Sequence, residues 1–424
     1  MQQQKALQIN GLLFAVAMWL LSRLLIAVAM LLIAPLLPAP PGGIAPTFGW
    51  GVFFAWDSVF YEKIASFGYE YAPERKEYLV AFFPLFPLLI RGVMNLGLPF
   101  EVAGTLVNNL AFLGALIVLY EWIEERHGIS AARWVTAVLA WCPLSLFGTV
   151  IYTEGLYLLF STAALRAFDR QEYGWVALWG AIATAARPTG IALIPAFLVA
   201  AVRESLGAIA YAAGLAAGGG LLLFSLYCAI RFGEPLLFLY AQQAWRSSLG
   251  FDWLGWWKML MQIVVGTTNW KYGSIKDPWH PLLFAIALSS GYLLWRFRNQ
   301  VGFAKVGYGF AFLWLFLWLL AGDPLINVVT IFGGGYLLWH MRVHLSQVTV
   351  IYGFCALGLL LASGSTISLS RIAYGIVSLA IALGVLLARH PRWGYAVMVF
   401  FAILLTSFSI RFAQEQWVAY VSCQ

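Results

Sequence analysis

The chain has 424 residues, of which 62% are hydrophobic and only 10% are charged, whereas charged residues make up about 25% of an average soluble domain. This composition excludes a water-soluble globular protein. The formal net charge of +7 does not indicate a nucleic-acid binder, because the basic residues stand singly in short segments between apolar runs.

Apolar runs of about 20 residues, the length that crosses a hydrocarbon core, begin near the N-terminus and recur to the end of the chain. The first run is too long for a signal-peptide core and is expected to stay as a spanning helix. We predict an all-α polytopic membrane protein, a single domain over 1–424, with about thirteen spans. The predicted spans are 9–33, 103–122, 134–150, 155–168, 174–186, 189–202, 206–230, 280–295, 303–321, 325–339, 347–363, 371–388 and 393–411.

Several of these runs are short for a full crossing, notably the two that flank Arg187. Short helices are expected to be tilted, broken or re-entrant where protein or a water-filled cavity surrounds them. Such interruptions often mark a binding site.

Residues 80–96 decide the orientation of the chain. They contain Pro84 and Pro87, one helical turn apart, and Arg91, which favours a helix on the membrane surface over a spanning one. If this segment does not span, the basic residues of the short loops all fall on the side of Lys5, as the positive-inside rule requires. These residues are Arg126, Arg133, Arg170, Arg203, Arg296, Arg298, Lys305, Arg342, Arg389 and Arg392.

Two long polar segments then lie outside the membrane on its non-cytoplasmic face, residues 34–102 and 231–280. The second segment is rich in tryptophan and lysine, which is typical of an anchor at the headgroup level. A lid over a lipid or sugar site is the alternative, because tryptophan rings also stack on sugars. The residues concerned are Trp245, Trp253, Trp256, Trp257, Trp270 and Trp279, with Arg246, Lys258, Lys271 and Lys276 among them.

The first outer segment places Trp56 and Asp57 directly before residues 58–67, whose pattern predicts an amphipathic helix. Asp57 suits the N-cap of that helix, since aspartate is a preferred cap. An acid among aromatic residues at the membrane face is equally suited to act as a base. Both interpretations stay open on local pattern alone.

The motifs of this segment resemble those of a known family. Trp56-Asp57, Ile64-Ala65, Gly68-Tyr69 and Ala81-Phe82-Phe83-Pro84 are followed in order by Tyr152-Thr153-Glu154, Ala186-Arg187-Pro188-Thr189-Gly190 and Ser368-Leu369-Ser370-Arg371. Together they resemble the GPI mannosyltransferase II family and its bacterial relatives, which have the GT-C glycosyltransferase fold. Tyr61 and Ile372 depart from the residues usual at these positions in the family, histidine and tyrosine, and this leaves the acceptor open.

The resemblance implies transfer of mannose from dolichyl- or polyprenyl-phosphate mannose, with Asp57 as catalytic base. Trp56, Tyr61, Phe83 and Glu154 are the candidate substrate-binding residues, and Glu154 is expected either to orient the acceptor or to pair with Arg187. The donor's phosphate is already a stable anionic leaving group, so one carboxylate that activates an acceptor hydroxyl is sufficient. The carboxylate pair of glycoside hydrolases is not needed, and no second member is assigned among Glu62, Glu70, Glu74 and Glu77.

Two arginines are the candidates for binding the donor phosphate. Arg187 stands between two apolar runs, where an unpaired charge costs several kcal/mol, and a guanidinium binds phosphate in a bidentate manner. An internal ion pair with Glu154 is the alternative for Arg187. Arg371 begins a predicted span on the same side and is either a second phosphate ligand or an interface anchor.

No metal or cofactor is predicted. His340 and His344 are four residues apart, but they fall on the predicted cytoplasmic side and have no third ligand. The outer segments lack an Asp-x-Asp pair, and a monophosphate donor demands a cation less than a diphosphate does. The expected partners are a lipid-phosphate sugar donor, a lipid-linked or glycan acceptor and membrane lipids, without nucleic acid.

Two rival functions are a transporter or lipid flippase and a GT-C enzyme that uses another lipid-phosphate sugar. A transporter also predicts many helices and a buried arginine, but the hydropathy pattern contains no inverted repeat. The expected location is the plasma membrane of a bacterium with an extracytoplasmic site, or the endoplasmic reticulum membrane with a lumenal site.

Overall fold

The computed structural model describes residues 2–72, 77–244, 250–416 and 418. Trp245 and Arg246 of the tryptophan-rich segment, and Glu74, lie outside the described residues. The chain divides into two compact units. Unit 1 comprises residues 1–247, 335–360 and 371–416, and unit 2 comprises residues 248–334, 361–370 and 417–424.

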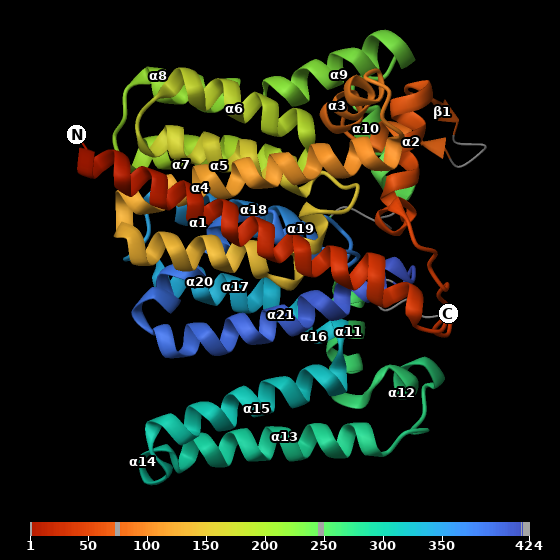
Figure 1. Cartoon of the computed structure of the whole chain (residues 1–424), viewed down its shortest axis with the longest axis vertical. Coiled ribbons are helices and arrows are strands. Elements are labelled where there is room, and N and C mark those ends of the chain that lie inside the picture. The colour runs from red at the N-terminus through yellow and green to blue at the C-terminus, as the bar shows by residue number, and fades with distance from the viewer. Residues whose placement is uncertain (1, 73–76, 245–249, 417, 419–424) are drawn as a thin grey trace. The chain divides into compact units, whose positions relative to one another are not determined.

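Unit 1 is a helical bundle with one small pair of antiparallel strands (Figure 1). Its elements are α1 (Gln2–Ala27), α2 (Asp57–Phe67), β1 (Tyr71–Ala72), β2 (Glu77–Tyr78), α3 (Leu85–Met94), α4 (Phe100–Trp141), α5 (Glu154–Asp169), α6 (Tyr173–Ala186), α7 (Leu193–Arg203), α8 (Ala208–Ala216), α9 (Gly219–Phe232), α10 (Leu237–Ala241), α17 (Gly334–Met341), α18 (Gln347–Leu361), α19 (Leu369–Tyr374), α20 (Val377–Arg389) and α21 (Pro391–Ala413). Short 3₁₀ or π turns join them at Val28–Ile33, Ala34–Leu36, Trp50–Phe53, Leu79–Ala81, Pro143–Gly148, Pro188–Ala192 and Gln242–Ala244.

Unit 2 is built around two long helices, α13 and α15, that lie side by side. Its elements are α11 (Trp253–Val265), α12 (Thr267–Tyr272), α13 (Trp279–Arg296), α14 (Arg298–Val301), α15 (Phe303–Ala321), α16 (Asp323–Val328) and a π turn at Val329–Gly333. The tryptophan-rich segment is thus largely helical. Trp256 is buried, whereas Trp253, Trp257 and Trp279 are exposed.

Each predicted span coincides with a helix, a pair of helices or part of one, so the all-α prediction is confirmed. Length and apolarity identify fewer crossings. In the described part of the chain three helical segments meet both criteria, Ile9–Leu36, Phe100–Trp141 and Pro391–Ala413, and α8 with α9 makes a fourth if the bent pair is one span. The count of thirteen therefore stays a prediction.

The long helices are interrupted where the sequence contains glycine or proline. The predicted span 103–122 and the first part of the span 134–150 both lie in α4, which ends at Trp141. Gly128 breaks this helix with φ 80°, a left-handed conformation that glycine adopts without steric cost. The pair α8 and α9 bends by 43°. The predicted break at Arg187 is present, because α6 ends there and Pro188 begins a new 3₁₀ turn.

The first outer segment folds as predicted over its two helices. Residues 58–67 lie in α2. The α-helix within the 80–96 segment is the ten-residue α3, which at 1.5 Å per residue is about 15 Å long. This length is too short to cross a bilayer. A surface position for α3 is consistent with its length.

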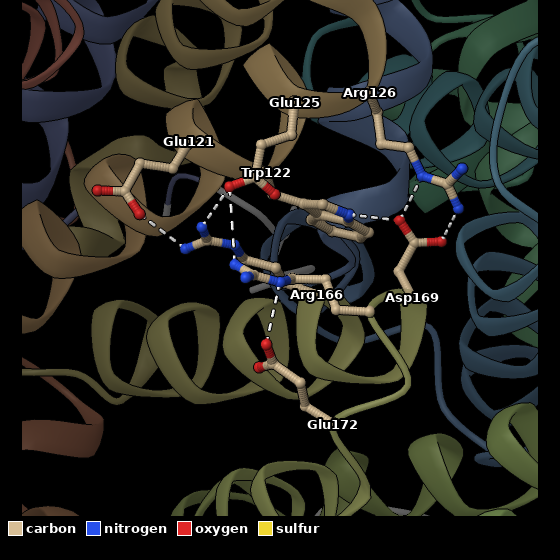
Figure 2. Close-up of polar contacts among 8 residues, drawn as sticks. Glu121, Trp122, Glu125, Arg126, Arg166, Asp169 and Glu172 are labelled. Carbon is tan, nitrogen blue, oxygen red and sulfur yellow. Dashed lines mark hydrogen bonds and ion pairs between the residues drawn. The ribbon is translucent and has the colours of Figure 1, made fainter. Parts of the chain in front are cut away.

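Charged side chains of α4 and α5 form ion pairs at the end of unit 1 where α5 ends. Arg126 of α4 pairs with Asp169 of α5, and Arg166 contacts Glu121 and Glu125 at 2.7 Å each (Figure 2). His127 of α4 also interacts electrostatically with Arg389 and His344. Figure 1 places α2 and α3 at the opposite end of unit 1 from the N-terminus of α1. The assignment of the basic loops to one side of the membrane stays a prediction.

Candidate active site

Asp57 is the first residue of α2, and the residue before it has an unusual backbone conformation. The N-cap is Trp56, so of the two open interpretations the one in which Asp57 caps this helix is wrong. Trp56 has φ 50°, a left-handed conformation that costs a bulky residue about 1–3 kcal/mol and is typical of functional sites. The turn leaves the Asp57 carboxylate available for a contact elsewhere in the fold.

That contact is with Arg371 of α19. Nη1 of Arg371 donates a hydrogen bond to Oδ2 of Asp57 at 2.5 Å. The Asp57 side chain is 21% exposed and the Arg371 side chain 11%. A charge-assisted hydrogen bond between two largely buried groups is strong. It fixes the position of the carboxylate proposed from the sequence as the base.

Glu154 and Arg187 extend this ion pair deeper into the protein. Glu154 is the first residue of α5, and its side chain is 1% exposed. Nη1 of Arg187 lies 3.0 Å from Oε1 of Glu154, and Nε of Arg371 lies 3.8 Å from the same oxygen. The ion pair between Arg187 and Glu154, one of the two alternatives in the sequence analysis, is therefore present.

The local sequence explains why these two charged side chains face each other. A negative side chain is favoured at a helix N-terminus, where the backbone amide groups are unpaired, and Glu154 occupies that position in α5. Arg187 is held in an extended conformation, φ −153° and ψ 145°, because the following proline disfavours the helical region. The helix break thus directs Arg187 out of the regular helix.

The four residues form one continuous chain of charges, in the order Asp57, Arg371, Glu154 and Arg187. Two carboxylates and two guanidinium groups balance in formal charge. Burying ions is costly unless they are paired. Four charged side chains in one largely buried region are therefore tolerated because they pair with one another. Clusters of this kind are candidates for functional sites.

Aromatic rings surround the Arg371 end of the cluster. The guanidinium carbon lies 4.8 Å from the ring centroid of Tyr152 and 5.6 Å from that of Phe147. The Trp56 ring packs edge-on against Phe412 with centroids 5.0 Å apart. Aromatic faces attract a guanidinium and also suit the apolar face of a sugar ring.

Tyr61 lies close to the same charges but is enclosed by other rings. It is buried and packs edge-on against Phe82 and Phe86, at centroid distances of 5.3 and 5.1 Å. Burial, and next the negative charge of Asp57, raise the pKa of Tyr61 above its ordinary value. Its hydroxyl therefore stays protonated and can donate a hydrogen bond.

Phe83 is not part of the charged cluster. Its ring is 2% exposed and belongs to a hydrophobic cluster that contains Phe224 and Phe238, with centroids 4.9 and 5.5 Å away. The substrate contact expected for Phe83 stays a prediction. In the described structure its neighbours are those of a core residue.

Asn108, which holds the loop before Glu154, is not among the candidate residues predicted from the sequence. Nδ2 of Asn108 donates to the carbonyl oxygens of Phe147 at 2.8 Å and Val150 at 2.6 Å, and Oδ1 of Asn108 accepts from the amide of Gly155 at 2.8 Å. Asn108 is fully buried. A polar pair, Asn108-Asn109, inside an apolar run was the signal available in the sequence.

Three further side chains bind backbone carbonyl groups of the same loop. Asn109 donates to Thr149 at 3.0 Å, Ser58 to Ile151 at 3.2 Å, and Arg23 to Ser145 at 2.9 Å. The loop is buried, and buried backbone groups require such partners because they cannot bind bulk water. The loop from Pro143 to Thr153 is therefore a fixed part of the site.

Residues 12–241, more than half of the chain, match the family model described as Mannosyltransferase (PIG-V). A comparison with curated protein sequences finds no match.

Solved structures with a similar fold include ArnT from Cupriavidus metallidurans bound to undecaprenyl phosphate. It is 13% identical in sequence with a TM-score of 0.51, and the match covers 91% of this chain and 62% of ArnT. The oligosaccharyltransferase of Archaeoglobus fulgidus, in complex with Zn and sulfate, is 12% identical with a TM-score of 0.45, covering 95% of this chain and 53% of that one. This chain thus spans less than two thirds of the length of either protein. On the family match and the likeness to ArnT, the chain belongs to the Mannosyltransferase (PIG-V) family and is an integral membrane protein with the GT-C fold of membrane glycosyltransferases.

Proposed function

We propose that this protein is a membrane glycosyltransferase that moves mannose from a polyprenyl- or dolichyl-phosphate mannose donor to a hydroxyl group of a lipid-linked or extracytoplasmic glycan acceptor. The observation that carries the proposal is the Asp57–Arg371 ion pair and its extension to Glu154 and Arg187. One carboxylate and two guanidinium groups are the functional groups that this reaction needs. Membership of a mannosyltransferase family favours it over a transporter.

In the proposed reaction Asp57 removes the proton from the acceptor hydroxyl. The hydroxyl oxygen forms a bond to the anomeric carbon of the mannose, and the bond from that carbon to the phosphate oxygen breaks. The electron pair of the broken bond goes to the phosphate, which leaves as a polyprenyl phosphate. A single displacement inverts the anomeric centre, so that a β-linked donor gives an α-mannoside.

Arg187 and Arg371 are proposed to bind the donor phosphate. Both side chains are about nine-tenths buried, at 10% and 11% exposure. A guanidinium in a low-dielectric site stabilises the negative charge that develops on the leaving phosphate more strongly than it would in water. ArnT, which has a similar fold, was solved bound to undecaprenyl phosphate, and this supports a lipid-phosphate donor here.

Aromatic residues next to the charged cluster are proposed to line the substrate site. Trp56 and Tyr61 lie beside the proposed base, where a ring face and a protonated hydroxyl can contact a sugar. Glu154 contacts both proposed phosphate ligands. The active site is proposed to face the outside of a bacterial plasma membrane or the lumen of the endoplasmic reticulum, because the positive-inside rule assigns the basic loops of the sequence to the cytoplasmic side.

The test is a transfer assay on the purified full-length protein in lipid nanodiscs. Polyprenyl-phosphate mannose and its glucose counterpart are supplied separately, with a membrane lipid extract as acceptor, and the release of polyprenyl phosphate is measured. We expect release from the mannose donor alone. Release from the glucose donor alone would mean that the protein is a glycosyltransferase with a different donor sugar, and no release from either donor would contradict the proposed chemistry.

A further inference from the structure

Glu154 is held by two arginines through a single carboxylate oxygen. Nη1 of Arg187 and Nε of Arg371 lie 3.0 and 3.8 Å from Oε1. The Glu154 side chain is 1% exposed, so it is almost completely removed from solvent. Its negative charge is therefore balanced by protein groups and not by bulk water.

These ion pairs are not supported by well-formed hydrogen bonds. Among the described residues, neither carboxylate oxygen of Glu154 has a hydrogen-bond partner of acceptable geometry, and the same is true of Nη1 of Arg187 and Nε of Arg371. Nearly all buried polar groups in proteins are hydrogen-bonded. By contrast, Arg371 donates a 2.5 Å hydrogen bond to Asp57, so the contacts of the two arginines with Glu154 are ion pairs that leave hydrogen-bonding capacity unused.

Unfilled hydrogen-bonding capacity on two buried cations indicates a ligand that is an anion with several acceptor oxygens. A lipid phosphate has that chemistry, and it can replace Glu154 as the partner of both guanidinium groups. Glu154 stays close by, and its negative charge repels the phosphate. The repulsion is stronger for the product than for the donor, because transfer converts a singly charged phosphodiester into a monoester with a charge of about −1.5 to −2.

We infer that Glu154 is an internal counter-ion which occupies Arg187 and Arg371 in the empty enzyme, yields them to the donor phosphate and then weakens the hold on the product phosphate. The inference rests on the proposed function, in which these arginines bind the donor phosphate. Glu154 is then a positioning residue that sets the affinity for phosphate. Substitution of a residue in a substrate site usually weakens binding, whereas the opposite is expected here. Removing its charge should tighten binding.

The experiment measures the affinity of the full-length protein in nanodiscs for polyprenyl phosphate, the reaction product, together with steady-state transfer. For Glu154→Gln we expect the affinity for polyprenyl phosphate to increase about tenfold, which corresponds to ~1.4 kcal/mol. KM for the donor should fall, and kcat should fall with it, because release of the product becomes slow. A residue with only a structural role would not tighten binding.

Three other variants complete the design. Glu62→Gln removes a carboxylate of α2 outside the charged cluster and should change neither affinity nor transfer. Glu154→Gln combined with Arg187→Gln restores the balance of buried charge but removes one phosphate ligand, so the gain in affinity should disappear. Glu154→Asp keeps the charge but retracts it by one methylene group, and it should tighten binding by less than Glu154→Gln.

The outcomes separate the inference from the function on which it rests. If the wild-type protein transfers mannose, and Glu154→Gln binds polyprenyl phosphate equally or more weakly, the counter-ion role is overturned and the proposed function stands. If Glu154→Gln does not fold, Glu154→Asp decides in the same way. If the wild-type protein neither binds polyprenyl phosphate nor transfers sugar, the proposed function itself fails.

Discussion

Asp57 and Arg371 are 314 positions apart in the chain, and their side chains form a hydrogen-bonded ion pair at 2.5 Å. One begins α2 and the other lies in α19. The pair restrains the proposed base and places it next to a proposed phosphate ligand. Binding of donor and activation of acceptor are thus expected at adjacent positions.

The first prediction concerns the proposed base. Asp57→Asn keeps the size of the side chain but cannot accept the acceptor's proton, so kcat should fall by a factor of about 10²–10⁴. Donor binding should be retained, because the variant removes no cation. The measurement is transfer rate and polyprenyl phosphate affinity in the same preparation. Glu62→Gln is the matched control, and a folded Asp57→Asn protein with near wild-type kcat would rule out Asp57 as the base.

A second prediction concerns Asn108 and the loop before Glu154. Asn108→Leu removes three buried hydrogen bonds and leaves backbone groups unpaired, at a cost of about 1–3 kcal/mol for each group that finds no other partner. The melting temperature in detergent should fall clearly. Asn109→Leu, which removes two partly buried hydrogen bonds from the neighbouring residue, should have a smaller effect. Equal losses in the two variants would argue against a special role for Asn108.

The close approach of α4 and α5 at Gly155 gives a third prediction. A Cβ atom added there would lie 2.4 Å from the backbone oxygen of Asn108, so Gly155→Ala should destabilise the protein by about 1–3 kcal/mol through overpacking. Gly358 of α18 is the control, since a Cβ at that position meets nothing within 4 Å. Gly358→Ala should be neutral or stabilising by up to ~1 kcal/mol. Thermal unfolding of both variants tests this difference, and similar shifts would contradict the packing argument.

The last prediction concerns the charged residues at the other end of the bundle. Asp169 is 6% exposed, pairs with Arg126 and accepts a hydrogen bond from Nε1 of Trp122 at 2.9 Å (Figure 2). Asp169→Asn should lower stability by about 1 kcal/mol, since Arg126 is half exposed and its charge is screened by solvent.

Transfer activity of Asp169→Asn should stay unchanged, because this cluster lies apart from the four charged residues of the site. Glu172→Gln, at an exposed ion pair with Arg170, should alter stability by less than about 0.5 kcal/mol. Loss of transfer in a well-folded Asp169→Asn protein would show that the two ends of unit 1 are coupled.

The sequence determined the features that depend on neighbours along the chain. Apolar runs predicted the helices, because hydrophobic patterning is local, and Pro188 predicted the break beside Arg187. The family motifs identified Asp57, Glu154, Arg187 and Arg371 one by one as candidates. The amphipathic helix over residues 58–67 was also predicted from its local pattern, and it is present as α2.

Only the tertiary structure decided which of these residues meet. Local pattern suited Asp57 as a helix cap, but in the folded chain its carboxylate is paired with a guanidinium from α19. Phe83, a motif residue, lies in a separate hydrophobic cluster, whereas Asn108, outside every motif, holds the loop that carries Glu154. The physical reason is that contacts between residues far apart in sequence are set by how helices pack, and that packing depends on the shapes of all the side chains together.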